Sequence, residues 1–322
     1  TSGPATNRGT DPTGSLFAPQ SGDGPDAGMI PPRTILAAID FSDTSKAALV
    51  LAARLARQCR AELHVLHVEH PLLAAAARHA GIDLTLETHE ELQQFIAAAA
   101  PAADGSIHAH VEAGSAVEVI IERAHKLRAD LVVVGGRGMS GAEKIVFGST
   151  TEGLLRRSDV SVLVVPTGWA APHPTAPDLS GVGPVVVGID PSDSSIAGAK
   201  AACALASVLK TSVEVVHIVP DLAVLGRWRA HAETAVRDRV SAARRELEPL
   251  VQGLGCSVPV QLHVRTGAVA DQLAHAASTG RDRAPIVVLG KKLPDSHGGA
   301  PGTIAYRVLS MADAPVLMYV GP

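Results

Sequence analysis

The sequence predicts an α/β protein with two tandem, doubly wound, parallel five-stranded sheets. Short β-branched runs, such as LVVV at residues 131–134, alternate with longer segments whose apolar residues recur at the 3.6-residue period of a helix. The motif IDFSD at residues 39–43 returns as IDPSD at residues 189–193, an offset of 150 residues (189 − 39). Such an offset indicates a duplication. Further identities keep it without a gap: Ala47 with Ala197, Ala52 with Ala202, Leu55 with Leu205, Ala56 with Ala206, Val65 with Val215 and His67 with His217.

The first copy is predicted at residues 33–166, after a tail (residues 1–32) whose Gly, Pro, Ser, Thr and Asp content predicts disorder. Met29 is a candidate natural start within this tail. Ser42 or Asp43 is placed to cap the first helix, and the alanine-rich segment at residues 71–100 breaks near Gly81. The predicted order is strand 34–39, helix 44–58, strand 62–68, two helical pieces within 71–100, strand 106–111, helix 115–128, strand 131–134, a short helix from residue 149 to about 157, and strand 160–165.

A Pro/Gly/Ala-rich linker at residues 167–183 leads to the second copy at residues 184–322. The alternation of short apolar runs and helical periods returns there, so the same sheet is expected. The predicted elements are strands 185–189 and 212–218, helix 225–251, strand 258–264, helix 268–278, strand 286–289, helix 303–312 and strand 316–320.

Composition and charge argue against several classes of partner. The 322 residues carry a formal net charge of −4 and 2% aromatic residues, which disfavours duplex and single-stranded nucleic acid alike. No apolar run reaches the roughly 18 residues that span a bilayer, and no basic-then-apolar signal pattern is present. Cys59, Cys203 and Cys256 are an odd, widely spaced set that predicts neither a disulfide framework nor a metal site. A cytoplasmic protein without a membrane partner is expected.

A glycine-rich loop between the fourth strand and the short helix is the strongest candidate for a ligand site. Glycines let backbone N–H groups approach a ligand closely, since no Cβ stands in the way. We expect Ser149 or a neighbouring threonine to cap the helix, whose free N–H groups and dipole favour phosphate. Arg137 and Lys144 add positive charge within the loop. The segment therefore predicts a phosphate cradle.

Two nucleotide-binding motifs fit this loop poorly. Residues 136–141, GRGMSG, match G-x-G-x-x-G, but they follow the fourth strand rather than the first. The acidic residue about 20 positions on, Asp159, precedes the next strand instead of following it, so a dinucleotide site is disfavoured. A P-loop is excluded because no Gly-Lys-Ser/Thr sequence is present.

Asp40 and several histidines have both a functional and a structural interpretation. Asp40 lies where the first strand meets its helix, a position that serves a ligand at a switch point or a simple turn; its recurrence as Asp190 fits a structural role equally well. The histidines resemble a metal cluster, yet side chains alternate along a strand. We expect packing at strand ends rather than a metal. The four are His64, His67, His70 and His217.

The residues together resemble a known family. The spacing Gly135-x2-Gly138-x9-Gly148-Ser149 matches the G-2x-G-9x-G(S/T) signature of ATP-binding universal stress proteins. IDFS at 39–42, LHV at 66–68 and SVLVV at 161–165 follow in that family's order. The chain after residue 32 resembles a tandem universal stress protein, which implies a Rossmann-like fold of the adenine nucleotide alpha hydrolase type. It also implies an internal pseudo-dimer in which strands 160–165 and 316–320 pair antiparallel; a homodimer of the whole chain is left open.

By this resemblance the ligand is an adenine nucleotide, ATP with or without Mg, held by the first copy. Ala stands at position 38 where family members usually show Pro or Gly, and its methyl group narrows the adenine slot only slightly. The residues implied for binding are Ala38, Asp40 and Val68 for ribose and adenine, Gly135 and Gly138 for close approach of the loop, and Gly148, Ser149 and Thr150 for the phosphates.

The second copy departs from the signature. Leu293 stands where the second glycine is expected, and the first-to-third glycine interval is 12 residues (302 − 290) against 13 in the first copy (148 − 135). Lys291 and Lys292 could still attract phosphate, while Pro294 and Pro301 stiffen the loop. We expect weaker binding there, or none. The residues implied by the resemblance in this copy are Gly188, Asp190, Gly290, Gly302 and Thr303.

Three functions follow as hypotheses. The first is an ATP-binding regulator of stress or dormancy responses, with an unknown protein partner. The second is a slow ATPase or a nucleotidyl-transferring enzyme; no nucleophile–base pair or second cation-binding carboxylate is evident in the sequence. The third is a scaffold that binds no nucleotide.

Overall fold

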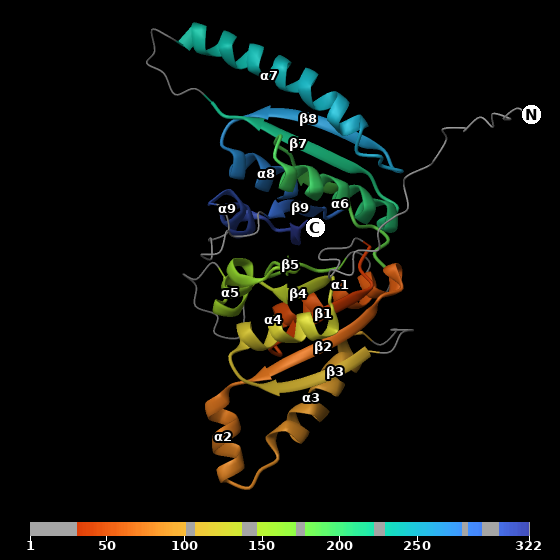
Figure 1. Ribbon diagram of the computed structural model, residues 1–322, viewed down its shortest axis with the longest axis vertical. Helices are drawn as coiled ribbons and strands as arrows, with labels where there is room; N and C mark the ends of the chain where they lie inside the picture. The colour runs from red at the N-terminus through yellow and green to blue at the C-terminus, as the bar shows by residue number, and fades with distance from the viewer. Residues whose placement is uncertain are drawn as a thin grey trace, which may run out of the picture.

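The computed structural model describes residues 31–100, 107–136, 147–171, 178–221, 229–278, 283–291 and 303–321. Ten strands form one continuous sheet in the order β3-β2-β1-β4-β5-β10-β9-β6-β7-β8. Figure 1 shows the first repeat at one end of the long axis and the second repeat at the other, with the sheet running between them. The predicted α/β class with two doubly wound halves is confirmed.

The first repeat forms the half-sheet β3-β2-β1-β4-β5, in which all neighbouring strands are parallel. Chain order reverses between β1 and β4, which is the switch point of a doubly wound sheet. Its elements are β1 (Thr34–Ile39), α1 (Asp43–Cys59), β2 (Glu62–Glu69), α2 (Pro71–His79), α3 (Leu84–Ala99), β3 (Ile107–Ala113), α4 (Ala116–Leu127), β4 (Leu131–Gly135), α5 (Ser149–Arg157) and β5 (Ser161–Val165).

The second repeat builds the same parallel half-sheet in mirror order, β10-β9-β6-β7-β8. The helix between its second and third strands begins at Arg229. Residues 225–228, which were predicted as the start of this helix, lie outside the described residues. Its elements are β6 (Val185–Gly188), α6 (Asp193–Leu209), β7 (Val213–Val219), α7 (Arg229–Gln252), β8 (Val260–Thr266), α8 (Val269–Ser278), β9 (Ile286–Lys291), α9 (Thr303–Met311) and β10 (Val316–Val320).

The two half-sheets join through an antiparallel pair, β5 with β10, as the family resemblance implied. Leu163 lies opposite Leu317, and the Val320 amide donates a hydrogen bond of 3.1 Å to Ser161 Oγ. This pairing leaves neither repeat with an open edge at its last strand. The internal pairing is therefore confirmed.

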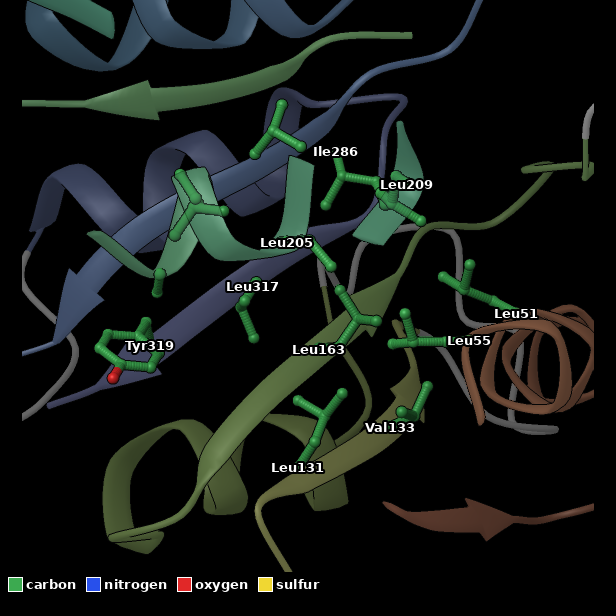
Figure 2. Close-up of a cluster of buried hydrophobic side chains, with 14 of the residues drawn as sticks. Leu51, Leu55, Leu131, Val133, Leu163, Leu205, Leu209, Ile286, Leu317 and Tyr319 are labelled. Carbon is green, nitrogen blue, oxygen red and sulfur yellow. The ribbon is translucent and has the colours of Figure 1, made fainter. Parts of the chain in front are cut away.

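Both faces of the sheet carry a hydrophobic core that crosses the join. One face is covered by α1, α3, α6 and α7, and the other by α4, α5, α8 and α9. Figure 2 shows the first face, where Leu55 of α1, Leu163 of β5 and Leu205 of α6 lie in one cluster with Leu317 of β10. Burial of apolar area shared by two repeats stabilises them as one unit. Within the described ranges, no helix combines the length and apolarity needed to cross a bilayer.

Each repeat begins its first helix with the same cap. Ser42 is the N-cap of α1, and its hydroxyl accepts a hydrogen bond of 3.1 Å from the Ser45 amide. Ser192 caps α6 in the same way. Both helices end on a residue in the left-handed conformation, Arg60 and Lys210. Local geometry thus preserves the duplication seen in the sequence.

The expectation that the cysteines form no disulfide is wrong. Cys203 of α6 and Cys256 form a disulfide with their Cα atoms 5.1 Å apart. Their sequence separation of 53 hides this proximity. The segment after α7 folds back along α6, where Ser257 also donates a hydrogen bond of 3.0 Å to Ser207. Cys59 is free. The cysteine pattern therefore gives no support for a reducing compartment.

Candidate nucleotide site

A cavity of about 210 Å³ opens at the carboxyl ends of β1, β2 and β4, beside the switch point of the first repeat. Ligands in open α/β sheets bind at this place. The walls come from strand ends, from α4 and from the first turn of α5. The lining residues are Ala38, Ile39, Asp40, Ser45, Leu66, His67, Val68, Ala116, Ile120, Val134, Gly135, Gly148, Ser149, Thr150 and Thr151.

The structure brings together most of the residues of the first repeat that were predicted for the site. Gly138 lies outside the described residues, as do Arg137 and Lys144. Ile120 and Thr151 also face the cavity; the helical period of α4 and the helix-start pattern of α5 are the signals that could have placed them there. What the cavity binds stays a prediction. The predicted residues that line it are Ala38, Asp40, Val68, Gly135, Gly148, Ser149 and Thr150.

The N-terminus of α5 faces this cavity without a side-chain cap. Gly148 is the N-cap residue in an extended conformation, and no side chain of the described residues accepts from the first amides. Ser149 and its neighbours were predicted to cap the helix, which is wrong: Ser149 is the first helical residue, and the Thr151 hydroxyl donates a hydrogen bond of 2.7 Å to the Gly135 carbonyl. Uncapped amides at a helix N-terminus favour an anion.

Asp40 is held by the turn that begins α1. Its Oδ1 accepts from the Ser42 amide at 3.1 Å and from the Ser42 hydroxyl at 2.6 Å. Asp190 makes the same two bonds to Ser192, at 3.0 and 2.5 Å. The structural interpretation of this aspartate is therefore correct in both repeats. In the first repeat the carboxylate also lies at the cavity rim, fixed in orientation by its own turn.

The strand-end histidines pack as predicted. His67 Nδ1 lies 2.9 Å from the Ile39 carbonyl, and His217 Nδ1 lies 2.8 Å from the Ile189 carbonyl. These contacts tie the second strand of each repeat to the end of its first. His70 caps α2 by accepting a hydrogen bond from the backbone at 3.3 Å. Among the described residues, no group of three His, Cys, Asp or Glu side chains could hold a metal ion.

A second histidine group was missed in the sequence because its members come from different strands. His64 of β2 stacks on His108 of β3 at 4.8 Å between ring centroids, and its Nδ1 lies 2.9 Å from His110 Nε2. Arg123 of α4 and Glu112 form an ion pair beside them. Burial, followed by the charge of His108, lowers the pKa of His64, and burial, followed by the charge of Arg123, lowers the pKa of His110.

Gly135 is required by the close packing of α1 against the end of β4. A Cβ at this residue would lie 3.0 Å from Thr44 Cγ2 and 3.1 Å from the Ser45 amide nitrogen. The corresponding Gly290 is tighter still, since a Cβ there would lie 2.0 Å from the Ser194 carbonyl oxygen. In both repeats the glycine at or next to the end of the fourth strand lets the first helix lie close against that strand.

Comparison with known proteins identifies the family. The model of the universal stress protein family matches residues 32–166. The stress response protein NhaX of Bacillus subtilis is 30% identical over 161 residues, which cover 41% of this chain and 96% of that protein. The chain belongs to the universal stress protein family.

Two further comparisons extend over both repeats of this universal stress protein. A universal stress protein of Mycolicibacterium smegmatis is 27% identical over 304 residues, which cover 88% of this chain and 96% of that protein. The crystal structure of a universal stress protein from Archaeoglobus fulgidus has a TM-score of 0.63 at 20% sequence identity and covers 90% of this chain and 99% of that chain. The likeness of fold therefore spans the tandem arrangement.

The second repeat of this universal stress protein differs at the place that corresponds to the cavity. A Cβ on Gly188 would lie 3.1 Å from Leu273 Cδ1 and 3.4 Å from Leu289 Cδ2. Two leucine side chains therefore lie against the position that Ala38 occupies in the first repeat. Asp190 and Gly290 keep their places in the fold, Thr303 opens α9, and Gly302 lies outside the described residues.

The expectation that Lys291 attracts phosphate in the second repeat is wrong. Its side chain is only 8% exposed, and its ammonium group donates a hydrogen bond of 2.5 Å to the Ser158 carbonyl of the first repeat. Burial lowers the pKa of Lys291, while the nearby Asp159 acts in the opposite direction. The charge is therefore used at the join between repeats. Lys292, Leu293, Pro294 and Pro301 lie outside the described residues.

Proposed function

We propose that the first repeat binds ATP and that this universal stress protein acts as a nucleotide-dependent regulator in stress or dormancy responses. The observation that carries the proposal is the cavity in which the uncapped N-terminus of α5 and the fixed carboxylate of Asp40 face one space. A helix N-terminus favours phosphate, and a carboxylate accepts hydrogen bonds from ribose hydroxyl groups. Groups suited to the phosphates and to the ribose thus line the same cavity.

The proposal gives each part of the ligand a place along the walls. The apolar slot beside Ala38 and Val68, closed by Ile120, suits the flat face of adenine. The backbone at Gly148 and Ser149 supplies amides for the phosphates. The cytoplasm, where adenine nucleotides are abundant, is the proposed compartment.

The duplication supplies a matched pair of variants for the test. Asp40 and Asp190 make the same two hydrogen bonds to their turns, so Asp40→Asn and Asp190→Asn change the same turn, and Asp40 lines the described cavity whereas Asp190 does not. Titration calorimetry with ATP is expected to show binding by the parent chain. Asp40→Asn is expected to weaken it about tenfold, since a hydrogen bond to a charged group contributes about 1.5 kcal/mol or more. Asp190→Asn is expected to bind as the parent does.

Three results would decide against the proposal or move it. No ATP binding by the parent chain would leave only the scaffold hypothesis. Weaker binding in Asp190→Asn alone would place the working site in the second repeat. Steady release of ADP or pyrophosphate under excess ATP would favour the enzyme hypothesis over the regulator.

A further inference from the structure

The second repeat holds α5 of the first repeat at both ends. At the N-terminal end, the ring of Phe147 meets the ring of Tyr306 from α9 in a T-shaped contact, with centroids 5.1 Å apart and planes at 83°. Phe147 is 4% exposed and directly precedes Gly148, the N-cap of α5. At the C-terminal end, the Lys291 ammonium group bonds the carbonyl of Ser158, the C-cap of α5.

Phe147 and Tyr306 belong to the hydrophobic core that crosses the join, and together with Lys291 they contact both ends of α5. A cation at the last carbonyls of a helix complements its dipole, and an edge-to-face ring pair has a defined orientation. A second cavity, of about 280 Å³, lies between Gly136 of the first repeat and the end of α9 with the turn after it, where Leu309 and Ala312 line it. Phe147 lines this space, and its contact with Tyr306 is one of the links between the repeats beside it.

We propose that the second repeat is a positioning domain, in which Tyr306 and Lys291 set the place of α5 and so the affinity of the first repeat for the phosphates of ATP. This inference rests on the proposed function of the first repeat. Neither side chain lines the nucleotide cavity, so both act through α5. In this proposal, the amides at the start of α5 depend on the second repeat. Lys291, at the end of that repeat's fourth strand, is directed toward α5 of the first repeat.

The test uses the full chain and four variants. Tyr306→Leu removes the ring contact and keeps an apolar side chain, while Tyr306→Phe retains the ring. Ile304→Ala is the matched control on the same helix, because Ile304 is 47% exposed. Lys291→Met removes the contact at the other end of α5 without shortening the stem. Two quantities are measured for each: ATP affinity by titration calorimetry, and amide hydrogen exchange of residues 149–158 without nucleotide.

Tyr306→Leu is expected to weaken ATP binding about two- to tenfold, the range of a ring–ring contact, and to speed exchange at the start of α5 by a similar factor. Lys291→Met is expected to weaken binding in the same direction and to speed exchange at residues 155–158. Tyr306→Phe and Ile304→Ala are expected to match the parent in both measurements.

The outcomes separate this inference from the proposed function. If the parent binds ATP and Tyr306→Leu and Lys291→Met change neither affinity nor exchange, the positioning role is overturned and ATP binding stands. Equal effects of Ile304→Ala and Tyr306→Leu would also overturn it, because they would show general loosening of α9. If the parent chain binds no ATP, the proposed function and this inference fall together.

Discussion

Replacing Thr151 with valine tests whether the tie between α5 and β4 shapes the nucleotide site. The Thr151 side chain is 3% exposed, and its hydroxyl donates to the Gly135 carbonyl at 2.7 Å. Valine has the same shape but no donor, so a buried carbonyl loses this partner at a cost of about 1–3 kcal/mol. The added methyl group returns up to about 0.8 kcal/mol. A net loss of about 1–2 kcal/mol in the free energy of unfolding is expected.

The matched variant is Thr151→Ser, which keeps the hydroxyl and loses the methyl group. Urea unfolding followed by circular dichroism is expected to show lower stability for both variants, by about 1 kcal/mol for serine. ATP affinity separates them: Thr151→Val is expected to bind about fivefold more weakly, equivalent to about 1 kcal/mol, and Thr151→Ser as the parent does. Unchanged affinity in Thr151→Val with weaker binding in Thr151→Ser would refute the role of the hydrogen bond.

Three further predictions concern stability, each followed by urea unfolding. The pKa values of His64 and His110 are lowered from 6.5 in the folded chain, so the unfolded chain binds protons first on acidification. The free energy of unfolding is therefore expected to fall as the pH drops below about 6.5. His64→Gln is expected to make this fall between pH 7 and pH 5 smaller. Gly290→Ala is expected to destabilise the chain by about 1–3 kcal/mol through overpacking, and an unchanged midpoint would contradict the close helix approach. Dithiothreitol is expected to remove about 2–4 kcal/mol by opening the Cys203–Cys256 disulfide, whereas a Cys203→Ser variant should not respond to it.

The elements of the fold could be predicted because their signals are local. β-Branched runs such as the one that forms β4, and the helical period of α4, are contained within a few residues of sequence. The parallel, doubly wound sheet followed from the alternation of strands and helices, and the offset of 150 residues gave the second half. Even the cap at Ser42 could be expected, because an N-cap serine bonds a backbone amide only three residues away.

The contacts between elements could not be predicted in the same way. The pairing of Cys203 with Cys256 and the stacking of His64 on His108 depend on which helix or strand lies beside which. The sequence showed that a cation stands at position 291, but charge alone does not tell where a long side chain is directed. For the candidate site, the glycines were recognisable as a pattern, whereas the space left by Gly135 is occupied by α1.

The residue after the fourth-strand glycine differs between the two repeats, and this difference allows a contact across the join that two identical repeats could not make on one side only. In the first repeat this position is Gly136, whose amide donates a hydrogen bond of 2.7 Å to the Val165 carbonyl. In the second repeat it is Lys291, whose side chain crosses the β5–β10 join to α5. Two identical chains paired through the same strand would carry the same residue at this position on both sides. Two glycines would have no side chain to reach the partner, and two lysines would each lie beside a candidate site. Fusion in one chain lets the two copies differ. The loss of the glycine signature in the second repeat is then consistent with a division of labour, in which the first repeat holds the candidate site and the second repeat contacts α5 beside it.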